Sequence, residues 1–377
     1  MAMFSSSVAL LASELYSTHG GVQAYGRCLA EILSAYNDSH RGALDCVSLL
    51  DERPVESRHR QPLAYRTFYA SRGIKLRFAR QALMLGYRSK PGRLVIGHLG
   101  LAPVGWVLKR AGFTRSYVVV LHGIEAWQRV DWSDRVAIRD ASAVVTTTQF
   151  TALEFCRHNE VPFRRMRIIP LAVSESAIEE SGPVQASHGD PLRVLTVTRM
   201  TLADGYKGVD TLIDAVGRVK ARNIGITLEI VGTGDEVPRL KRRAEGLNLN
   251  GAVTFAGAVP DEELGRSYRA CDVFALPSAG EGFGIVFLEA MRYGKPCIGG
   301  NHGGTPEVIS HGNTGYLVRH GDVESLSRCL TTLAASPELR LAMGQKAAHA
   351  VRTRYLFTHM QSAWFSLLDE LAQADGP

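Results

Sequence analysis

The sequence predicts an α/β protein made of two doubly wound, Rossmann-like domains, each built on a parallel sheet. Short apolar runs of strand length alternate with helical patterns along nearly all of the 377 residues. The alternation occurs twice, and a polar segment containing Gly and Pro separates the two halves. Continuous apolar runs joined by helices are typical of parallel sheets, which bind ligands at the carboxyl ends of their strands. We therefore expect two domains that face each other across a ligand-binding cleft.

The first half of the chain contains six apolar runs that we interpret as strands. They are Val8–Ser13, Leu44–Leu50, Leu94–His98, Tyr117–His122, Ala143–Thr148 and Arg167–Leu171. Helical patterns lie between several of them, at Gly21–Ala35, Ile74–Tyr87, Ala102–Arg110 and Gln149–His158. This order of elements predicts a parallel sheet with helical crossovers.

The second half repeats the scheme more regularly. Its strand candidates are Arg193–Thr198, Thr227–Val231, Val253–Ala256, Val273–Pro277, Pro296–Gly299 and Gly315–Val318. Its helix candidates lie near residues 208–222, 235–247, 260–270, 285–293, 304–311 and 322–335. A second doubly wound domain is the simplest arrangement for these elements.

The domain boundaries follow from the polar segment Ser174–Pro191, which shows no periodicity and is the best linker candidate. We assign residues 1–175 to the first domain, 176–191 to the linker and 192–358 to the second domain. The last helix, at about residues 360–377, is amphipathic, and we expect it to pack back on the first domain.

The composition is that of an ordinary globular protein, because 45% of the residues are hydrophobic and 21% are charged. This excludes a disordered or fibrous chain. No apolar run reaches the length of about 20 residues that a membrane-spanning helix needs. The six cysteines lie far apart, without a Cys-x-x-Cys pair, and no Lys or Arg precedes the apolar run Val8–Ala12 as it would in a secretion signal. We expect a cytoplasmic protein.

The basic segment Arg53–Arg93 holds eleven Lys or Arg residues and one acidic residue, Glu56. Such a segment attracts phosphate groups, an anionic membrane surface or nucleic acid. Nucleic acid is disfavoured because interleaved aromatic residues and a known binding module are absent from the sequence. The stretch Ile74–Tyr87 mixes basic and apolar residues as a helix at a membrane interface does, although a solvated face or partial core packing would also explain it.

The most specific motif is Glu281–Glu289, with the sequence EGFGIVFLE, directly after a predicted strand. Gly282 and Gly284 permit close approach of the backbone, and the helix that begins beyond them offers free amides to an anion. The two glutamates border the same volume but would repel phosphate. We therefore expect them to accept hydrogen bonds from sugar or ribose hydroxyls.

Other candidate residues also follow strands, at the sheet edge where functional residues gather. Two cations, Arg199 and Lys207, come after the first strand of the second domain, and together they suit a diphosphate. The remaining candidates are Gly20 and Gly21, His122, Gly232 in the Gly-Thr-Gly turn, and Gly303-Gly304 with Glu307. Each of these signals is weak alone, and the case depends on their combination.

In this combination and order, the motifs resemble those of the retaining glycosyltransferases of family 4, which have the GT-B fold. The resemblance is close over residues 192–330. Over residues 1–175 it rests on Gly20-Gly21-Val22, on His122-Gly123 and on the layout of the elements. Two departures occur: the spacing from Arg199 to Lys207 is longer than usual, and Pro170-Leu171-Ala172-Val173 stands where many members have Pro-Asn-Gly-Val.

The resemblance implies a role for each matching residue. Arg199 and Lys207 would hold the donor diphosphate, Glu281 the sugar hydroxyls and Glu289 the ribose. Sugar and phosphate would contact the backbone at Phe283, Gly284, Ile285 and Val286. The amides of Gly20 and Gly21 would close over the phosphate, and Gly232 would also contact the donor. His122 would sit beside the transferred sugar. The family needs no divalent metal, so we expect no metal and no cofactor besides the nucleotide-sugar donor.

We therefore expect a retaining hexosyltransferase that uses a UDP- or GDP-sugar donor and a sugar acceptor. The expected acceptor is a lipid-linked sugar, in surface polysaccharide or glycolipid assembly. The expected location is cytoplasmic, at the inner face of the membrane if the basic segment binds there. One alternative is a GT-B nucleotide-sugar 2-epimerase, although no acid/base pair for it is evident. Another is a non-catalytic nucleotide-sugar-binding subunit.

Overall fold

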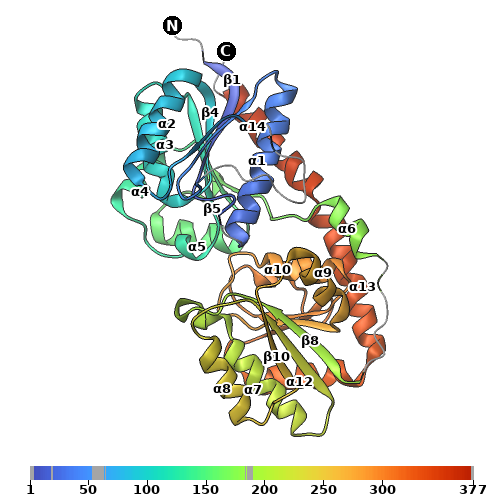
Figure 1. Cartoon of the computed structure of the whole chain (residues 1–377). Helices are drawn as coiled ribbons and strands as arrows, with labels where there is room; N and C mark the ends of the chain where they lie inside the picture. Colours follow the sequence, from blue (N-terminus) through green and yellow to red (C-terminus); the bar gives the residue numbers. More distant parts are fainter. Residues whose placement is uncertain are drawn as a thin grey trace. The chain divides into compact units, whose positions relative to one another are not determined.

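A computed structural model describes residues 4–17, 20–52, 63, 65–182, 184 and 190–374. The chain divides into two compact units (Figure 1). Unit 1 comprises Met1–Leu171 together with Met360–Pro377, and unit 2 comprises Ala172–His359. Each unit is a parallel sheet with helices packed against it, which confirms the predicted fold class.

Unit 1 contains a seven-stranded sheet in the order β3-β2-β1-β4-β5-β6-β7. The strands are β1 (Ser5–Ala12), β2 (Leu44–Ser48), β3 (Tyr65–Ala70), β4 (Pro91–Ile96), β5 (Ser116–Leu121), β6 (Ala143–Thr146) and β7 (Met166–Ile168). Its helices are α1 (Gly21–Ser39), α2 (Lys75–Ser89), α3 (Ala102–Arg110), α4 (Trp132–Asp140), α5 (Gln149–Asn159) and, from Met360 onward, the last helix, α14 (Phe357–Ala374). The strand order reverses between β1 and β4, which is the place where doubly wound sheets bind ligands.

The last helix packs on unit 1 through both apolar and polar contacts. Trp364 of α14 is fully buried. The hydroxyl of Tyr36 on α1 donates to Asp369 at 2.8 Å, and Arg167 of β7 pairs with Glu370 at 2.7 Å. These contacts attach the end of the chain to the unit formed by its beginning.

Unit 2 contains a six-stranded sheet in the order β10-β9-β8-β11-β12-β13. The strands are β8 (Leu192–Val197), β9 (Ile226–Val231), β10 (Val253–Gly257), β11 (Val273–Leu276), β12 (Cys297–Gly300) and β13 (Gly315–Val318). Its helices are α6 (Glu175–Ser181), α7 (Val209–Lys220), α8 (Val237–Gly246), α9 (Asp261–Ala270), α10 (Ile285–Arg292), α11 (Thr305–Val308), α12 (Val323–Ala335) and α13 (Pro337–Arg354). Here the order reverses between β8 and β11, so the loops after these two strands meet.

The structure differs from the sequence prediction in the segment 176–191. Helix α6 occupies its first part, because the Ser174 hydroxyl caps the helix by accepting from the Ala177 amide. Ser181 in this helix is buried. The polar composition therefore marks a short capped helix of unit 2, and residues 183 and 185–189 lie outside the described part of the chain.

Besides α6, one strand and two α-helices of the described residues have no counterpart in the prediction. Strand β3 lies at the edge of the sheet and is only half-buried, so its sequence lacks a continuous apolar run. Helix α4 is a short helix with two buried residues, Ala137 and Ile138. Helix α13 buries small and polar positions such as Gly344 and Arg340, which hides its helical period.

Among the described residues, no helix has the length and apolar character needed to cross a membrane.

Candidate functional site

The loop after β8 is an ordered turn that carries both predicted cations. It forms a 3-10 helix, η4 (Leu202–Lys207), capped by Thr201, whose hydroxyl donates to Asp204 at 2.6 Å. The second carboxylate oxygen of Asp204 accepts from Arg199 Nη2 at 3.4 Å. The Leu202 amide donates to Asp235 at 3.0 Å. The long spacing between Arg199 and Lys207 is therefore filled by a defined helical turn.

Gly208 brings this turn against the loop that follows β11. Its φ of 76° lies in the left-handed region, and a Cβ atom there would lie 2.4 Å from the Pro277 carbonyl oxygen. The Ala279 amide donates to the Tyr206 carbonyl at 2.7 Å and joins the two loops directly. The sheet order thus places Lys207 beside the Glu281–Glu289 motif.

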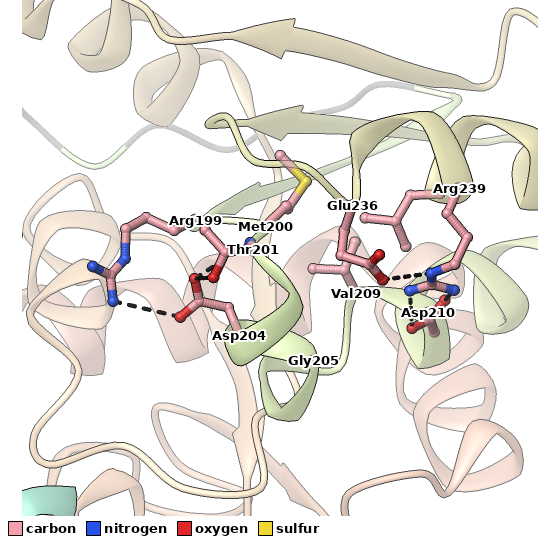
Figure 2. A pocket seen from close by; sticks show the side chains of 10 residues that line it. Arg199, Met200, Thr201, Asp204, Gly205, Val209, Asp210, Glu236 and Arg239 are labelled. Atoms are coloured by element: carbon pink, nitrogen blue, oxygen red, sulfur yellow. Dashed lines mark hydrogen bonds and ion pairs between the residues drawn. The ribbon is translucent and has the colours of Figure 1, made fainter.

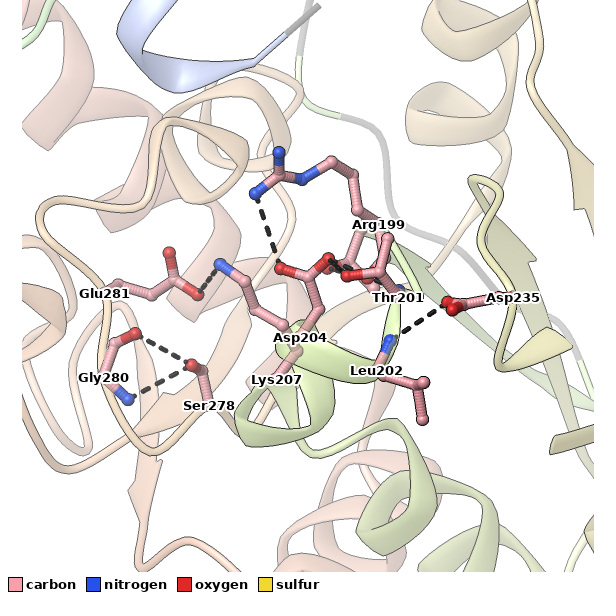
Figure 3. A network of polar contacts seen from close by, with 10 residues as sticks. Arg199, Thr201, Leu202, Asp204, Lys207, Asp235, Ser278, Gly280 and Glu281 are labelled. Carbon is pink, nitrogen blue, oxygen red and sulfur yellow. Dashed lines mark hydrogen bonds and ion pairs between the residues drawn. The ribbon is translucent and has the colours of Figure 1, made fainter. Parts of the chain in front are cut away.

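Lys207 and Glu281 form an ion pair in which Nζ lies 2.6 Å from Oε1 (Figure 3). Only 15% and 11% of the two side chains are exposed. Burial by itself would lower the pKa of Lys207, but the charge of Glu281 and contact with Tyr206 outweigh it, so the pKa is raised. Lys207 therefore stays charged at neutral pH.

The backbone around Glu281 is held from two sides. The Gly304 amide donates to the Glu281 carbonyl at 2.7 Å. The Ser278 hydroxyl donates to the Gly280 carbonyl at 3.1 Å and accepts from the Gly280 amide at 3.2 Å. These bonds fix the backbone that carries the Glu281 side chain.

Helix α10 begins directly after this loop and has open amides at its N-terminus. Gly284 caps it with φ 88°. Among the described residues, the amides of Phe283, Ile285 and Val286 have no hydrogen-bond acceptor. Phe283 is buried and packs edge-on against Tyr355, with ring centroids 5.8 Å apart. The free amides and the helix dipole favour an anion at this position.

Glu289 lies further along α10, where its Oε2 accepts from the Tyr268 hydroxyl at 2.8 Å. Burial raises the pKa of Glu289, and the hydrogen bond from Tyr268 and the charge of Arg292 oppose this effect. The two glutamates of the motif therefore have different partners, a cation for Glu281 and a neutral phenol for Glu289.

A small pocket beside η4 is lined by two arginines, Arg199 and Arg239 (Figure 2). Arg239 is held by Asp210 at 2.7 and 2.9 Å and by Glu236 at 2.5 Å. Arg199 has 71% of its side chain exposed and contacts Asp204 at 3.4 Å. Two carboxylates neutralise Arg239, so Arg199 is the arginine better suited to bind a phosphate.

Gly232 follows β9 and permits a close crossing of two strand ends. Its φ is 131°, and a Cβ atom would lie 1.9 Å from the Thr198 carbonyl oxygen, one residue before Arg199. Its amide donates to the Gly257 carbonyl at 2.8 Å. Gly232 therefore lets the backbone pass close to the strand end that carries Arg199.

The remaining predicted site residues belong to unit 1. His122 follows β5, and its Nε2 donates to the Gly97 carbonyl at 2.8 Å, which leaves Nδ1 as an acceptor. Burial lowers the pKa of His122, and the charge of Glu125 opposes this effect only in part. His122 is therefore neutral at pH 7. Gly20 caps α1, and Gly21 is its first residue.

Comparison with known proteins assigns the family. The sequence profile of the family described as glycosyl transferases group 1 matches residues 178–350. The GDP-mannose-dependent alpha-(1-6)-phosphatidylinositol monomannoside mannosyltransferase of Mycolicibacterium smegmatis is 32% identical over 270 residues, which span 66% of this chain and 68% of that protein. The chain belongs to the glycosyl transferases group 1 family. The resemblance predicted from the motifs is confirmed at this level, and the chain is a glycosyltransferase.

Another relative of this glycosyltransferase is the mannosyltransferase of the same name from Mycobacterium tuberculosis H37Rv. It is 39% identical over 145 residues, which span 37% of this chain and 38% of that protein. The chain therefore matches well under half the length of this second relative.

Solved structures share the fold over nearly the whole glycosyltransferase. Sucrose-phosphate synthase from Thermosynechococcus elongatus superposes with a TM-score of 0.79 and 21% identity, covering 98% of this chain and 100% of that one. Anabaena HepE in complex with UDP superposes with a TM-score of 0.77 and 21% identity, covering 97% and 100%. These neighbours confirm the GT-B fold class.

The structure therefore joins Lys207 to Glu281 directly and links Arg199 to the same turn through Asp204. Sequence reasoning missed Asp204 and Tyr268, which contact Arg199 and Glu289 respectively. The signal for Asp204 was present, because Thr201 followed by an acidic residue three positions later is a capping box. No local pattern pointed to Tyr268, because its contact with Glu289 joins two different helices.

Proposed function

We propose that this glycosyltransferase is a retaining enzyme that moves a hexose from a UDP- or GDP-sugar to a sugar acceptor. The single observation that carries the proposal is the Lys207–Glu281 pair beside the open amides of α10. This arrangement places a permanent cation, a carboxylate and an anion-binding helix end together. The cation and the helix end suit a diphosphate, and the carboxylate suits the hydroxyls of a sugar attached to it.

The incoming diphosphate would compete with Glu281 for Lys207. Lys207 and the exposed Arg199 then hold the two phosphates, together with the amides at Phe283, Ile285 and Val286. Glu281 is freed from the ion pair and accepts hydrogen bonds from the hydroxyls of the sugar. Glu289 accepts from the ribose.

Transfer breaks the bond between the anomeric carbon and the phosphate oxygen while the acceptor oxygen bonds to the same face of that carbon. The acceptor proton passes to the departing phosphate, which leaves as the nucleoside diphosphate. Lys207 and Arg199 stabilise the charge that develops on this leaving group. In this proposal the two side chains supply the positive charge and no divalent metal takes part.

The relatives support hexose transfer but differ in the nucleotide. The mycobacterial relatives are named as GDP-mannose-dependent enzymes, and the Anabaena neighbour was crystallised with UDP. Uracil and guanine are therefore both compatible with the proposed donor. Surface polysaccharide or glycolipid assembly with a lipid-linked acceptor remains the expected setting.

Helix α2 supports a location at the inner face of the membrane. Its core face is formed by Phe78, Ala82 and Leu85, which are buried. A second stripe at positions 76, 83 and 87 faces outward, with Leu76 81% and Tyr87 71% exposed. The helix thus packs in the core and also presents apolar side chains to the surroundings.

Basic residues flank the outer stripe of α2, at Lys75, Arg77, Arg80 and Arg88. Basic and apolar residues on one exposed surface suit an anionic lipid interface. We propose that this surface docks the enzyme on the membrane. The first part of the basic segment, residues 53–62, lies outside the described residues.

The decisive experiment measures binding and turnover with nucleotide sugars. Calorimetry with UDP and GDP should identify one base that binds, and NMR of the sugar released or transferred should show the same anomeric configuration as the donor. An inverted product would contradict retention. Formation of an epimer would support the 2-epimerase, and binding without any turnover would support a non-catalytic subunit.

A further inference from the structure

A contact near the site joins Tyr268 of α9 to Glu289 of α10, two helices that Figure 1 draws side by side in unit 2. The Tyr268 hydroxyl donates to one oxygen of the Glu289 carboxylate at 2.8 Å. Among the described residues, the second oxygen of Glu289 has no hydrogen-bond partner. One oxygen is therefore engaged by the protein and the other remains available to a ligand.

Tyr268 is fixed by its surroundings. It is almost completely buried, stacks on Tyr293 with centroids 6.0 Å apart, and packs against Phe274 of β11 at 5.8 Å. Burial, followed by the charge of Glu289, raises the pKa of Tyr268 well above its ordinary value. The phenol thus stays protonated and acts only as a donor toward the carboxylate.

We propose that Tyr268 is a positioning residue that orients Glu289 toward the ribose of the bound nucleotide. This inference rests on the proposed function, because it takes Glu289 as the ribose ligand. A carboxylate on a helix can adopt several rotamers, and binding would have to restrict them. The bond from an immobile phenol restricts them before the nucleotide arrives.

The same bond sets the pH range in which Glu289 is ionised. Burial raises the pKa of Glu289, while Tyr268 and Arg292 lower it, and the charge of Asp261 raises it. Loss of the Tyr268 hydroxyl therefore raises the pKa of Glu289 further. An ionised carboxylate is the better acceptor for a hydroxyl, so nucleotide affinity should fall as the pH drops through this pKa.

The experiment compares the full-length wild-type protein with Tyr268→Phe, which keeps the aromatic packing and removes only the hydroxyl. Calorimetry uses UDP and GDP, together with the 2′-deoxy and 3′-deoxy analogues of whichever binds. We expect the variant to bind the ribonucleotide about threefold to tenfold more weakly. The loss should be under twofold for the deoxy analogue that lacks the Glu289 contact, and the pH midpoint of binding should rise.

Two controls separate positioning from a general structural effect. Tyr316→Phe removes a hydroxyl from another half-buried tyrosine of unit 2, whose ring packs edge-on against His311 at 5.6 Å. It should leave affinity for the ribonucleotide within twofold. In a Glu289→Ala background, Tyr268→Phe should cause no additional loss, because the group that accepts from the Tyr268 hydroxyl is gone.

The inference fails if Tyr268→Phe weakens the ribonucleotide and both deoxy analogues equally, or leaves all affinities and the pH midpoint unchanged. If the wild-type protein binds neither UDP nor GDP, the proposed function fails first and the inference fails with it. These outcomes differ, since the first set requires a wild-type protein that binds a nucleotide.

Discussion

The strand ends of unit 2 carry fixed charges, whereas those of unit 1 carry a neutral histidine. In unit 2, Lys207 keeps its charge because Glu281 lies 2.6 Å away. In unit 1, burial holds His122 neutral and a backbone carbonyl fixes its tautomer. The two sheet edges therefore suit different tasks. In the proposed mechanism, unit 2 stabilises the charged leaving group and unit 1 hydrogen-bonds the uncharged sugar.

The largest effect is expected for Lys207→Ala. The variant lacks a fixed cation beside the charge that develops on the phosphate. We therefore expect kcat/KM to fall by a factor that corresponds to a loss of about 2–4 kcal/mol of transition-state stabilisation. Steady-state kinetics check this result, and thermal unfolding reports any loss of stability from the unpaired Glu281. The control is Lys220→Ala, an exposed lysine at the end of α7. Activity of Lys207→Ala within threefold of wild type would contradict the role of unit 2.

The next effect concerns the basic helix of unit 1. Replacing Lys75, Arg77 and Arg80 with Ser should reduce capture by anionic vesicles, because each basic residue contributes about 1 kcal/mol at such a surface. Co-sedimentation at low salt measures this loss, and high salt should release the wild-type protein. Nucleotide binding should not change.

The matched control for this triple variant replaces Arg139, Arg157 and Arg164 with Ser, which changes the net charge equally at exposed positions elsewhere in unit 1. If both variants sediment alike, the α2 surface has no special part in binding.

A third test compares the two glutamates within unit 2. Glu289→Gln should weaken binding of the nucleoside diphosphate by about 1.5–3 kcal/mol, the range for hydrogen bonds to a charged group. Glu281→Gln should preserve or strengthen that binding, because Lys207 loses its competing carboxylate, and should lower the transfer rate instead. Calorimetry and kinetics separate the two roles. Equal losses of binding for both variants would show that the roles are not divided in this way.

A smaller effect is expected for His122→Ala in unit 1. A single neutral hydrogen bond contributes about 0.5–1.5 kcal/mol, so kcat should fall about twofold to tenfold. Because burial lowers the pKa of His122, its protonation should reduce activity only below the pH range of an ordinary histidine. His158→Ala, on the exposed side of α5, serves as the control. A wild-type pH profile that falls between pH 7 and 6 and flattens in His122→Ala would show that the histidine is charged.

The smallest expected effect is that of metal removal. If Arg199 and Lys207 supply the positive charge, EDTA should leave the rate of sugar release unchanged. Activity that EDTA abolishes and Mn²⁺ restores would contradict the proposed site.

Local sequence patterns were sufficient to locate the predicted strands and the motif at the start of α10 along the chain. Strands such as β5 are buried on both faces and appear as continuous apolar runs, and glycines mark the backbone positions at Gly208 and Gly284 that require positive φ. The edge strand β3 and helix α13 were not predicted, because partial exposure and small buried residues remove the periodic signal.

The sequence by itself determined that two cations and two glutamates follow strands of one parallel sheet. Only the tertiary structure decided how they pair. Lys207 and Glu281 are 74 positions apart and meet because β8 and β11 are neighbours in the sheet. Arg199, which the sequence made equivalent to Lys207, remains largely exposed. Periodicity reports which positions are buried, but the choice of partner depends on which strands lie side by side, and the sequence of a single loop does not contain that information.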